Sequence, residues 1–551
     1  MTDIEIANSI TMQKIDKIAK KIDITPDQLY KFGEYKAKVV CPIEQNPTSK
    51  LILVTAINPT SAGIGKTTVS IGLADAMGLL KKKVCLALRE PSLGPVFGIK
   101  GGATGGGYSQ VVPMEDINLH FNGDFHAITS ANNLLCSLVD NHIFQGNELN
   151  IDPDKVLFHR CVDLNDRALR EITCAQGNKN GVARKDNFTI TAASEVMAIL
   201  TLAKNLDDLK QKLSNIMVAL TYDNRPVYAK DLQAQDAMAI LLKDAIYPNL
   251  VQTLSHTPAL VHCGPFANIA HGCNSVVATK LAMSKADYTI TEAGFGADLG
   301  AEKFLDLKCR LNDLKPNCVV IVATIKALKL HGGVDKTDLD TPNKQAVSKG
   351  LDNLIKHVET IQNVYKLPLV VTLNSYLTDT KEEINIVKHA INKLGVKFCI
   401  NNVWAKGGKG AKELANIVID LCEQDNSQFS FAYNLEDTVE QKITDIATKV
   451  YGADGVEFLD KAKSSIKTIN ELGLSNLPIV VAKTQYSLSD NQKLLARPTN
   501  FKITIRDIEI RTGAGFLVAL AGNMLLMPGL SKVPAAVGMK IDSNSNIEGL
   551  F

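Results

Sequence analysis

A short apolar run, a glycine loop and a helical segment follow one another near the amino terminus of this sequence. Residues 51–58 are apolar, residues 59–68 contain Gly63, Gly65 and Lys66, and residues 69–80 have the composition of a helix. This order is what a phosphate-binding loop requires, because loop amides and a helix N-terminus converge on an anion while a lysine reaches its outer phosphates. The usual pattern has glycine where this chain has Thr60, so the loop is an atypical version. A plain strand-to-helix turn with a solvated lysine is the alternative.

The composition is that of a globular protein without a global charge. A length of 551 residues exceeds one hydrophobic core and indicates several domains. Apolar residues make up 45%, charged residues 21%, and the formal net charge is +2. A charge this small creates no field that would draw the protein to nucleic acid or to an anionic membrane, so we expect neither partner.

The amino terminus and the cysteines indicate the cytoplasm. The first residues are acidic and polar, unlike a signal peptide, and no apolar run has the length of a membrane span. The eleven cysteines form no Cys-x-x-Cys pair, and several lie within apolar runs. This usage is typical of buried free thiols in a reducing compartment, so we expect a cytoplasmic protein.

Apolar, strand-like runs alternate with helical segments along the chain. The clearest runs are residues 84–88, 287–291, 318–324, 368–373, 396–400, 477–482 and 501–505. Such alternation is typical of an α/β protein with parallel sheets, in several domains. Residues 127–250 are predicted to be mostly helical, and an apolar helix is predicted after Phe516.

Charged residues follow the run 84–88 directly. Ligands of open parallel sheets bind beyond the carboxyl ends of the strands, which is where Arg89 and Glu90 emerge. An arginine at such a position can bind a phosphate or a carboxylate with two hydrogen bonds. A surface Arg–Glu pair is the alternative. Glycines and carboxylates follow the run 287–291 in the same way, over residues 292–300.

Three further features are candidates for a ligand site. Trp404 is the only tryptophan and stands beside a glycine turn, where it would offer a platform for a flat ligand; a core tryptophan is the alternative. Asp124 and His126 are candidates for acid–base chemistry, although a lone histidine is often structural. The glycine-rich stretch 101–107 is predicted to be either a lid that approaches a ligand or a mobile linker.

Several long blocks resemble formate–tetrahydrofolate ligase, also called formyltetrahydrofolate synthetase, in its monofunctional bacterial form. The resemblance covers almost the whole chain. The blocks that carry it are residues 62–68, 89–95, 100–108, 112–120, 264–274, 291–303, 403–408 and 527–530. Their length and order make this resemblance specific.

The resemblance implies a fold, a reaction and an assembly. The fold would be α/β, with a P-loop NTPase-like nucleotide domain over residues 1–335, a folate-side domain over 336–450 and a C-terminal domain over 451–551. Formate, activated by ATP as formyl phosphate, would be transferred to tetrahydrofolate to give 10-formyltetrahydrofolate, ADP and phosphate. The family uses Mg²⁺ with ATP, is activated by a monovalent cation (K⁺ or NH₄⁺), and forms a homotetramer.

The resemblance also implies the roles of particular residues. Lys66, Arg89 and Glu90 would be catalytic, and Asp124 is the candidate for the N10 proton. Tyr376 and Trp404 would stack on the pterin, and Gly294 and Phe295 would form the loop at the formyl phosphate. Metal-binding residues stay unassigned. The residues implied for ATP binding are Thr60, Ser61, Ala62, Gly63, Ile64, Gly65, Lys66, Thr67 and Thr68.

The sequence departs from the family pattern at the phosphate loop and at the folate clamp. The family usually has glutamate where this chain has Ile64, and phenylalanine followed by proline where it has Tyr376 and Leu377. The first change removes a carboxylate beside the phosphates, so a catalytically weakened paralogue is an alternative. Another P-loop ligase that forms acyl phosphates, or an ATP-gated assembly factor, are the other readings.

Overall fold

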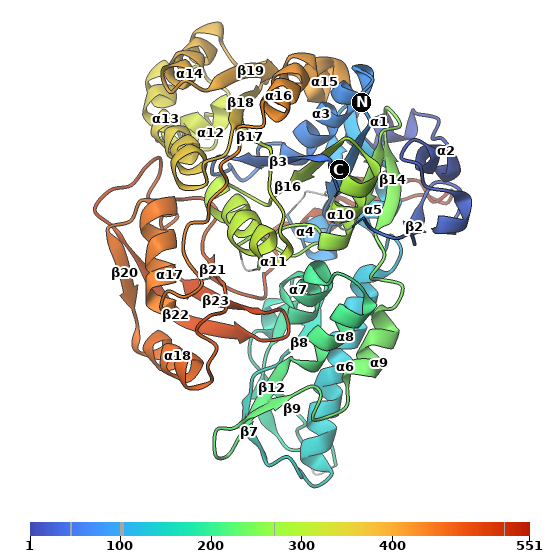
Figure 1. Ribbon diagram of the computed structural model, residues 1–551, viewed down its shortest axis with the longest axis vertical. Helices are drawn as coiled ribbons and strands as arrows, with labels where there is room; N and C mark the ends of the chain where they lie inside the picture. Colours follow the sequence, from blue (N-terminus) through green and yellow to red (C-terminus); the bar gives the residue numbers. More distant parts are fainter. Residues whose placement is uncertain (45–46, 100–103, 178, 269, 523, 551) are drawn as a thin grey trace.

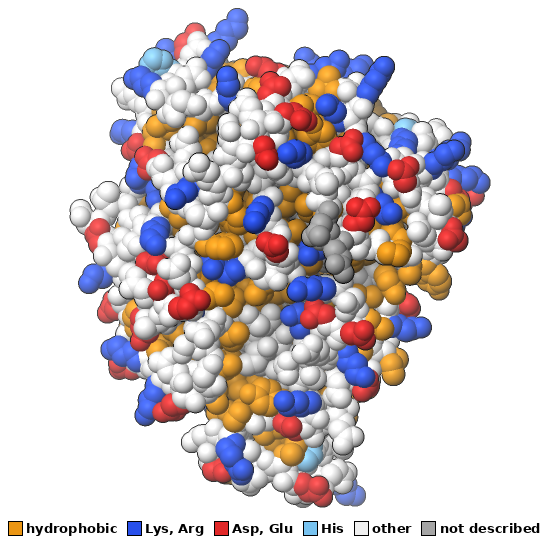
Figure 2. Space-filling view, viewed as in Figure 1, with side chains coloured by type: hydrophobic (Ala, Val, Ile, Leu, Met, Phe, Trp, Pro, Cys, Tyr) orange, Lys and Arg blue, Asp and Glu red, His pale blue; other side chains and the backbone are white. Residues whose placement is uncertain are grey.

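The computed structural model describes residues 1–44, 47–99, 104–177, 179–268, 270–522 and 524–550. A large central sheet is flanked by helices, with one lobe below it and a second, carboxyl-terminal lobe beside it (Figure 1). In the described part of the chain, no helix combines the length and the apolar character needed to cross a membrane. Charged side chains of both signs are interspersed over the face seen in Figure 2, as the nearly neutral composition predicts.

The central sheet has 12 strands, with β1-β2-β14-β15-β4-β16-β3-β17-β18-β19 as its main order. From β15 to β19 every neighbouring pair is parallel. The bounds of the strands are β1 Leu29–Lys31, β2 Ala37–Val39, β3 Lys50–Ala56, β4 Val84–Leu88, β5 Gly105–Gly106, β6 Ser109–Val112, β14 Asn249–Thr253, β15 Pro258–Val261, β16 Tyr288–Glu292, β17 Cys318–Ala323, β18 Leu369–Asn374 and β19 Lys397–Asn401.

The predicted α/β class with parallel strands is confirmed. Strands β3, β4, β16, β17 and β18 lie within about two residues of the apolar runs that predicted them, and their residues are buried on both faces. A parallel strand covered on both faces must be apolar throughout, which is why these strands appear as continuous apolar runs in the sequence.

Helices cover both faces of this sheet and build the lobes. Helix α3 follows β3 and packs against α15 and α16, whereas α10 packs against β4 and β16. The helices are α1 Asp3–Asn8, α2 Ile15–Lys20, α3 Lys66–Leu79, α4 Leu93–Gly98, α5 Met114–Asn118, α6 Asp124–Phe144, α7 Glu195–Leu202, α8 Leu206–Ser214, α9 Gln235–Leu242, α10 Val276–Lys285, α11 Arg310–Asn312, α12 Ile325–His331, α13 Lys344–Glu359, α14 Lys381–Lys393, α15 Val403–Lys406, α16 Lys412–Gln424, α17 Val439–Asp445 and α18 Asp460–Glu471.

The lower lobe corrects the prediction that residues 127–250 are mostly helical. Helices α6 to α9 lie there, but short strands occupy much of the rest: β7 Ile151–Val156, β8 Arg160–Val162, β9 Ile172–Cys174, β10 Arg184–Asp186, β11 Phe188–Ile190, β12 Met217–Thr221 and β13 Pro226–Tyr228. Several of these strands are only three residues long and half-exposed. Strands so short and polar leave no alternating apolar pattern to detect.

The carboxyl-terminal lobe corrects the predicted helix after Phe516. Residues Phe516–Ala521 form strand β23 of a four-stranded sheet ordered β20-β22-β23-β21. Alternate residues of β23 pack into two different cores: Leu517 and Ala519 join the core of the central sheet, whereas Val518 and Leu520 join that of the lower lobe. A short strand buried on both faces cannot be told from a buried helix by its apolar pattern. The other strands are β20 Gly455–Phe458, β21 Ile479–Ala482 and β22 Lys502–Arg511.

The predicted domain boundaries meet the sheet in different ways. The boundary at residue 335 falls between β17 and β18, which pair in parallel within the central sheet. The boundary at residue 450 falls just before β20, which belongs to the separate four-stranded sheet. The division into three domains stays a prediction.

Candidate functional site

The glycine loop joins the end of β3 to the start of α3 at Lys66. Gly63 and Gly65 have left-handed backbones, with φ of 83° and 82°, which glycine adopts without steric strain. A Cβ at Gly65 would lie 2.6 Å from Asn374 Nδ2, so a side chain there would also collide with the end of β18. The loop therefore turns tightly and presents the N-terminus of α3, a ready site for an anion.

The residues predicted to bind ATP phosphates differ in exposure. Ser61, Ala62 and Gly63 are exposed, whereas Thr60 and Thr68 are buried. The Ile64 side chain is only 1% exposed and belongs to the hydrophobic core, while its carbonyl accepts a 3.0 Å hydrogen bond from Asn374. Position 64 thus contributes backbone, not a side chain, to the surface of the loop.

A carboxylate and two cations meet beside this loop. Glu292, the last residue of β16, is fully buried; its Oε2 accepts a 2.8 Å hydrogen bond from Thr67, and its Oε1 lies 3.9 Å from Arg89 Nη2. Neither Glu292 Oε1 nor Arg89 Nε has a hydrogen-bond partner in the structure. The central sheet places β16 between β4 and β3, so these residues come from adjacent strand ends.

Lys66 belongs to the same cluster. Burial lowers the pKa of Lys66 to about 8; Glu292 opposes this shift and Arg89 adds to it. Lys66 is therefore still mainly protonated at neutral pH but is poised close to its titration. Arginine, by contrast, stays charged at every relevant pH. An incoming phosphate would favour the charged form of Lys66.

Glu90 faces a second buried cluster. Burial raises the pKa of Glu90 well above its usual range, and Asp124 raises it further, against the opposing effect of Lys38. Asp124 accepts hydrogen bonds from Lys38 at 2.7 Å and from Asn249 at 2.8 Å. Glu90 is thus held protonated and Asp124 ionised, while the neighbouring His126 is exposed.

The predicted formyl phosphate loop packs directly onto Arg89. A Cβ at Gly294 would lie 2.9 Å from Arg89 Nη1 and 2.7 Å from Ala267 Cβ, so only glycine allows this approach. Phe295, next in the chain, is partly buried and has a left-handed φ of 59°. That conformation is uncommon for a bulky residue, and such strain is often found at functional sites.

The two predicted folate residues follow adjacent parallel strands, β18 and β19, at the same sheet edge as the glycine loop. The Trp404 side chain is 52% exposed and that of Tyr376 41%, so both offer aromatic surface to a ligand. The Trp404 carbonyl accepts a 2.8 Å hydrogen bond from Tyr108, and Lys326 Nζ lies 5.0 Å from the Tyr376 ring centre.

Sequence reasoning missed two residues of these clusters. Glu292 carried a detectable signal, because it stands at the end of a predicted strand as Arg89 does. Lys38 carried none, since a lysine in a short strand normally indicates an exposed side chain. Of the glycine-rich stretch 101–107, residues 101–103 lie outside the described residues, and Gly105 and Gly106 form β5. No cluster of three or more His, Cys, Asp or Glu side chains suited to a metal ion occurs among the residues that the structure describes.

A comparison with protein-family models agrees with this geometry. The family model described as formate–tetrahydrofolate ligase matches residues 1–551, the whole chain.

The shifted pKa of Lys66 predicts how phosphate binding depends on pH. Lys66 is charged below about pH 8 and neutral above it, so ADP affinity should fall as pH rises through this value, by about tenfold per unit once the neutral form dominates. Lys66→Arg should bind ADP with little change over the same range, because arginine stays charged. Isothermal titration calorimetry at several pH values checks this. A parallel decline in both proteins would show that another group titrates.

Proposed function

The chain belongs to the formate–tetrahydrofolate ligase family, whose members are ATP-dependent ligases, and we propose that it works through a formyl phosphate intermediate. One observation carries the proposal: Lys66, Arg89 and Glu292 gather beside the glycine loop, while Tyr376 and Trp404 follow other strands at the same sheet edge. A site for transferred phosphate and a site for a flat substrate therefore share one edge.

In the proposed first step, a formate oxygen attacks the γ-phosphorus of ATP and the bond to the ADP oxygen breaks. Formate needs this activation because its carboxylate has no leaving group. Lys66 and Arg89 would stabilise the charge that spreads over the phosphoryl oxygens, and the loop amides of residues 60–68 would hold the other phosphates. Positioning and charge stabilisation are sufficient for such a transfer, without a covalent enzyme intermediate.

We propose that Mg²⁺ arrives with ATP as part of the substrate. It supplies charge neutralisation at the phosphates when bound. The Thr67 hydroxyl and the unpartnered Oε1 of Glu292 are oxygen donors of the kind that Mg²⁺ prefers, and both lie beside the loop. These two residues would hold the ion directly or through water.

In the proposed second step, N10 of tetrahydrofolate attacks the formyl carbon, the bond to phosphate oxygen breaks and the N10 proton is lost. Gly294 and Phe295 would enclose the formyl phosphate against Arg89. Protonated Glu90 would donate a hydrogen bond to it, and Asp124 would receive the N10 proton into the cluster that it forms with Lys38. The expelled phosphate would remain paired with Lys66 and Arg89.

The proposal extends to the folate clamp and to the assembly. Trp404 and Tyr376 would stack on the pterin, each contributing about 0.5–1.5 kcal/mol beyond area burial. Family resemblance further supports K⁺ or NH₄⁺ as an activator, a homotetramer, a cytoplasmic location and division into a nucleotide domain and two smaller domains.

A reaction assay tests the proposed function. Purified protein with formate, MgATP and tetrahydrofolate should form 10-formyltetrahydrofolate and ADP in equal amounts. Lys66→Ala should lose about 10² to 10³ of the turnover, because one charge that stabilises the transferred group is gone, while tetrahydrofolate still binds. Absence of a folate product from the unaltered protein would overturn the proposal. Product formation with another carboxylate, unaffected by added formate, would indicate a different acyl-phosphate ligase.

Trp404→Ala tests the folate clamp. We expect the KM for tetrahydrofolate to rise by about tenfold while ADP affinity stays the same, because the stacking surface is lost. Tyr222→Ala is the matched control, since Tyr222 is 56% exposed in the lower lobe and lies at no predicted site. An unchanged folate KM in Trp404→Ala would exclude the clamp.

Ile64→Glu tests the weakened-paralogue alternative. Because the Ile64 side chain is buried in the core, we expect the glutamate to destabilise the protein by about 2 kcal/mol or more, without a gain in turnover. Thermal unfolding and steady-state kinetics measure the two effects, with Ile64→Leu as the conservative control. A turnover gain of orders of magnitude would show instead that the native loop is impaired.

A further inference from the structure

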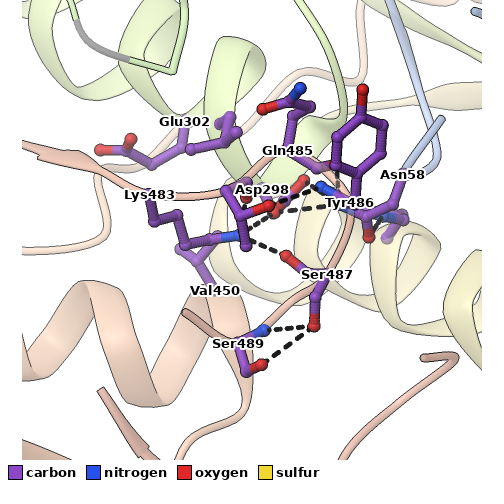
Figure 3. Close-up of polar contacts among 12 residues, drawn as sticks. Asn58, Asp298, Glu302, Val450, Lys483, Gln485, Tyr486, Ser487 and Ser489 are labelled. Carbon is purple, nitrogen blue, oxygen red and sulfur yellow. Dashed lines mark hydrogen bonds and ion pairs between the residues drawn. The ribbon is translucent and has the colours of Figure 1, made fainter. Parts of the chain in front are cut away.

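Asn58 stands at the junction between β3 and the glycine loop, and it is fully buried. Its Nδ2 donates to Asp298 Oδ1 at 3.1 Å and to the carbonyl of Gln485 at 3.1 Å (Figure 3). Its Oδ1 accepts hydrogen bonds from Asn353 at 2.9 Å and from His357 at 3.1 Å. Every polar atom of this side chain is therefore used, so its position is closely defined.

The main chain of Asn58 is held as well. Its N–H donates to Asn353 Oδ1 at 3.3 Å, and its carbonyl accepts a 3.1 Å hydrogen bond from His331. The other ring nitrogen of His331 accepts from the N–H of Ala496 at 3.1 Å. Asn58 is thus tied to helices α12 and α13 and to the carboxyl-terminal segment at once.

Asp298 and Lys483 continue this network into the carboxyl-terminal lobe. Lys483 Nζ lies 2.6 Å from Asp298 Oδ2, and both side chains are completely buried. Burial by itself would raise the pKa of Asp298, but Lys483 holds it below its usual range, so the carboxylate stays charged. Lys483 also donates to the carbonyls of Thr484 and Ser487.

This ion pair is placed to transmit position and not only to stabilise the fold. A buried ion pair contributes little net stability compared with apolar packing, because desolvation offsets the attraction. Here the pair joins two segments: Asp298 binds the residue that begins the phosphate loop, and Lys483 binds the carbonyls of residues 484 and 487 (Figure 3). A displacement of either segment would break hydrogen bonds that have no water to replace them.

We propose that Asn58, Asp298 and Lys483 couple the segment 483–489 to the phosphate loop, so that Asp298 and Lys483 are positioning residues for the nucleotide phosphates. The inference rests on the proposed phosphate site at residues 60–68. Because coupling is reciprocal, a ligand that orders the loop must also order the segment.

Hydrogen–deuterium exchange of the unaltered protein tests the coupling. Pyrophosphate is the probe, because it carries no adenosine that could touch residues 483–489 directly. Saturating pyrophosphate should slow exchange in a peptide covering 59–68 and also in one covering 483–489. Protection of the loop without protection of 483–489 would overturn the coupling alone. Failure to protect the loop would count against the proposed phosphate site itself.

Kinetics of variants supply the second test. Asn58→Ala and Lys483→Met should each raise the KM for ATP by about tenfold, with kcat changed less than about threefold and the folate KM unchanged. Asn58→Ala should also lose the pyrophosphate protection of 483–489. Asn132→Ala is the control: Asn132 is equally buried and donates to the His159 carbonyl at 2.9 Å, but it lies on α6.

The control separates positioning from general destabilisation. If Asn132→Ala lowers the melting temperature as much as Asn58→Ala but leaves the KM for ATP unchanged, the effect of Asn58 is specific to the loop. An unchanged KM for ATP in folded Asn58→Ala, or an equal rise in Asn132→Ala, would overturn the proposal.

Discussion

The parallel pairing of β4, β16 and β3 is the constraint on which the site depends. Parallel strands end at one edge of a sheet, and their crossover connections separate them widely in the chain. The register pairs Thr291 with Ala87 and Glu292 with Val54, so Arg89, Glu292 and the loop before Lys66 emerge together. No local sequence feature brings these groups into contact; the sheet does.

Burial then decides the chemistry of the groups at this edge. The same loss of water that lowers the pKa of Lys66 raises that of Glu90, so one group is poised near its titration and the other is kept protonated. Arg89 and Glu292 retain buried polar atoms without partners. Such atoms are costly in an unliganded protein, and a bound anion with its metal ion would satisfy them.

The carboxyl-terminal sheet connects the remaining parts of the molecule. Its two faces join two cores, one shared with the central sheet and one with the lower lobe, and this wedge brings Lys483 to Asp298. The start of the phosphate loop is therefore held by residues more than 400 positions away, such as Gln485. A nucleotide site that appears local in the sequence has a support drawn from the whole chain.

The sequence by itself determined the parallel α/β class, the glycine loop and the charged and aromatic residues after strands, because apolar runs and glycines are local signals. It did not distinguish strand β23 from a helix, since burial on both faces removes the periodic pattern. Only the tertiary structure decided that Ile64 points into the core, that Lys38 and Asp124 form a buried pair and that Asn58 anchors the loop. Side-chain direction and pairing depend on partners far away in the chain, and no local pattern records them.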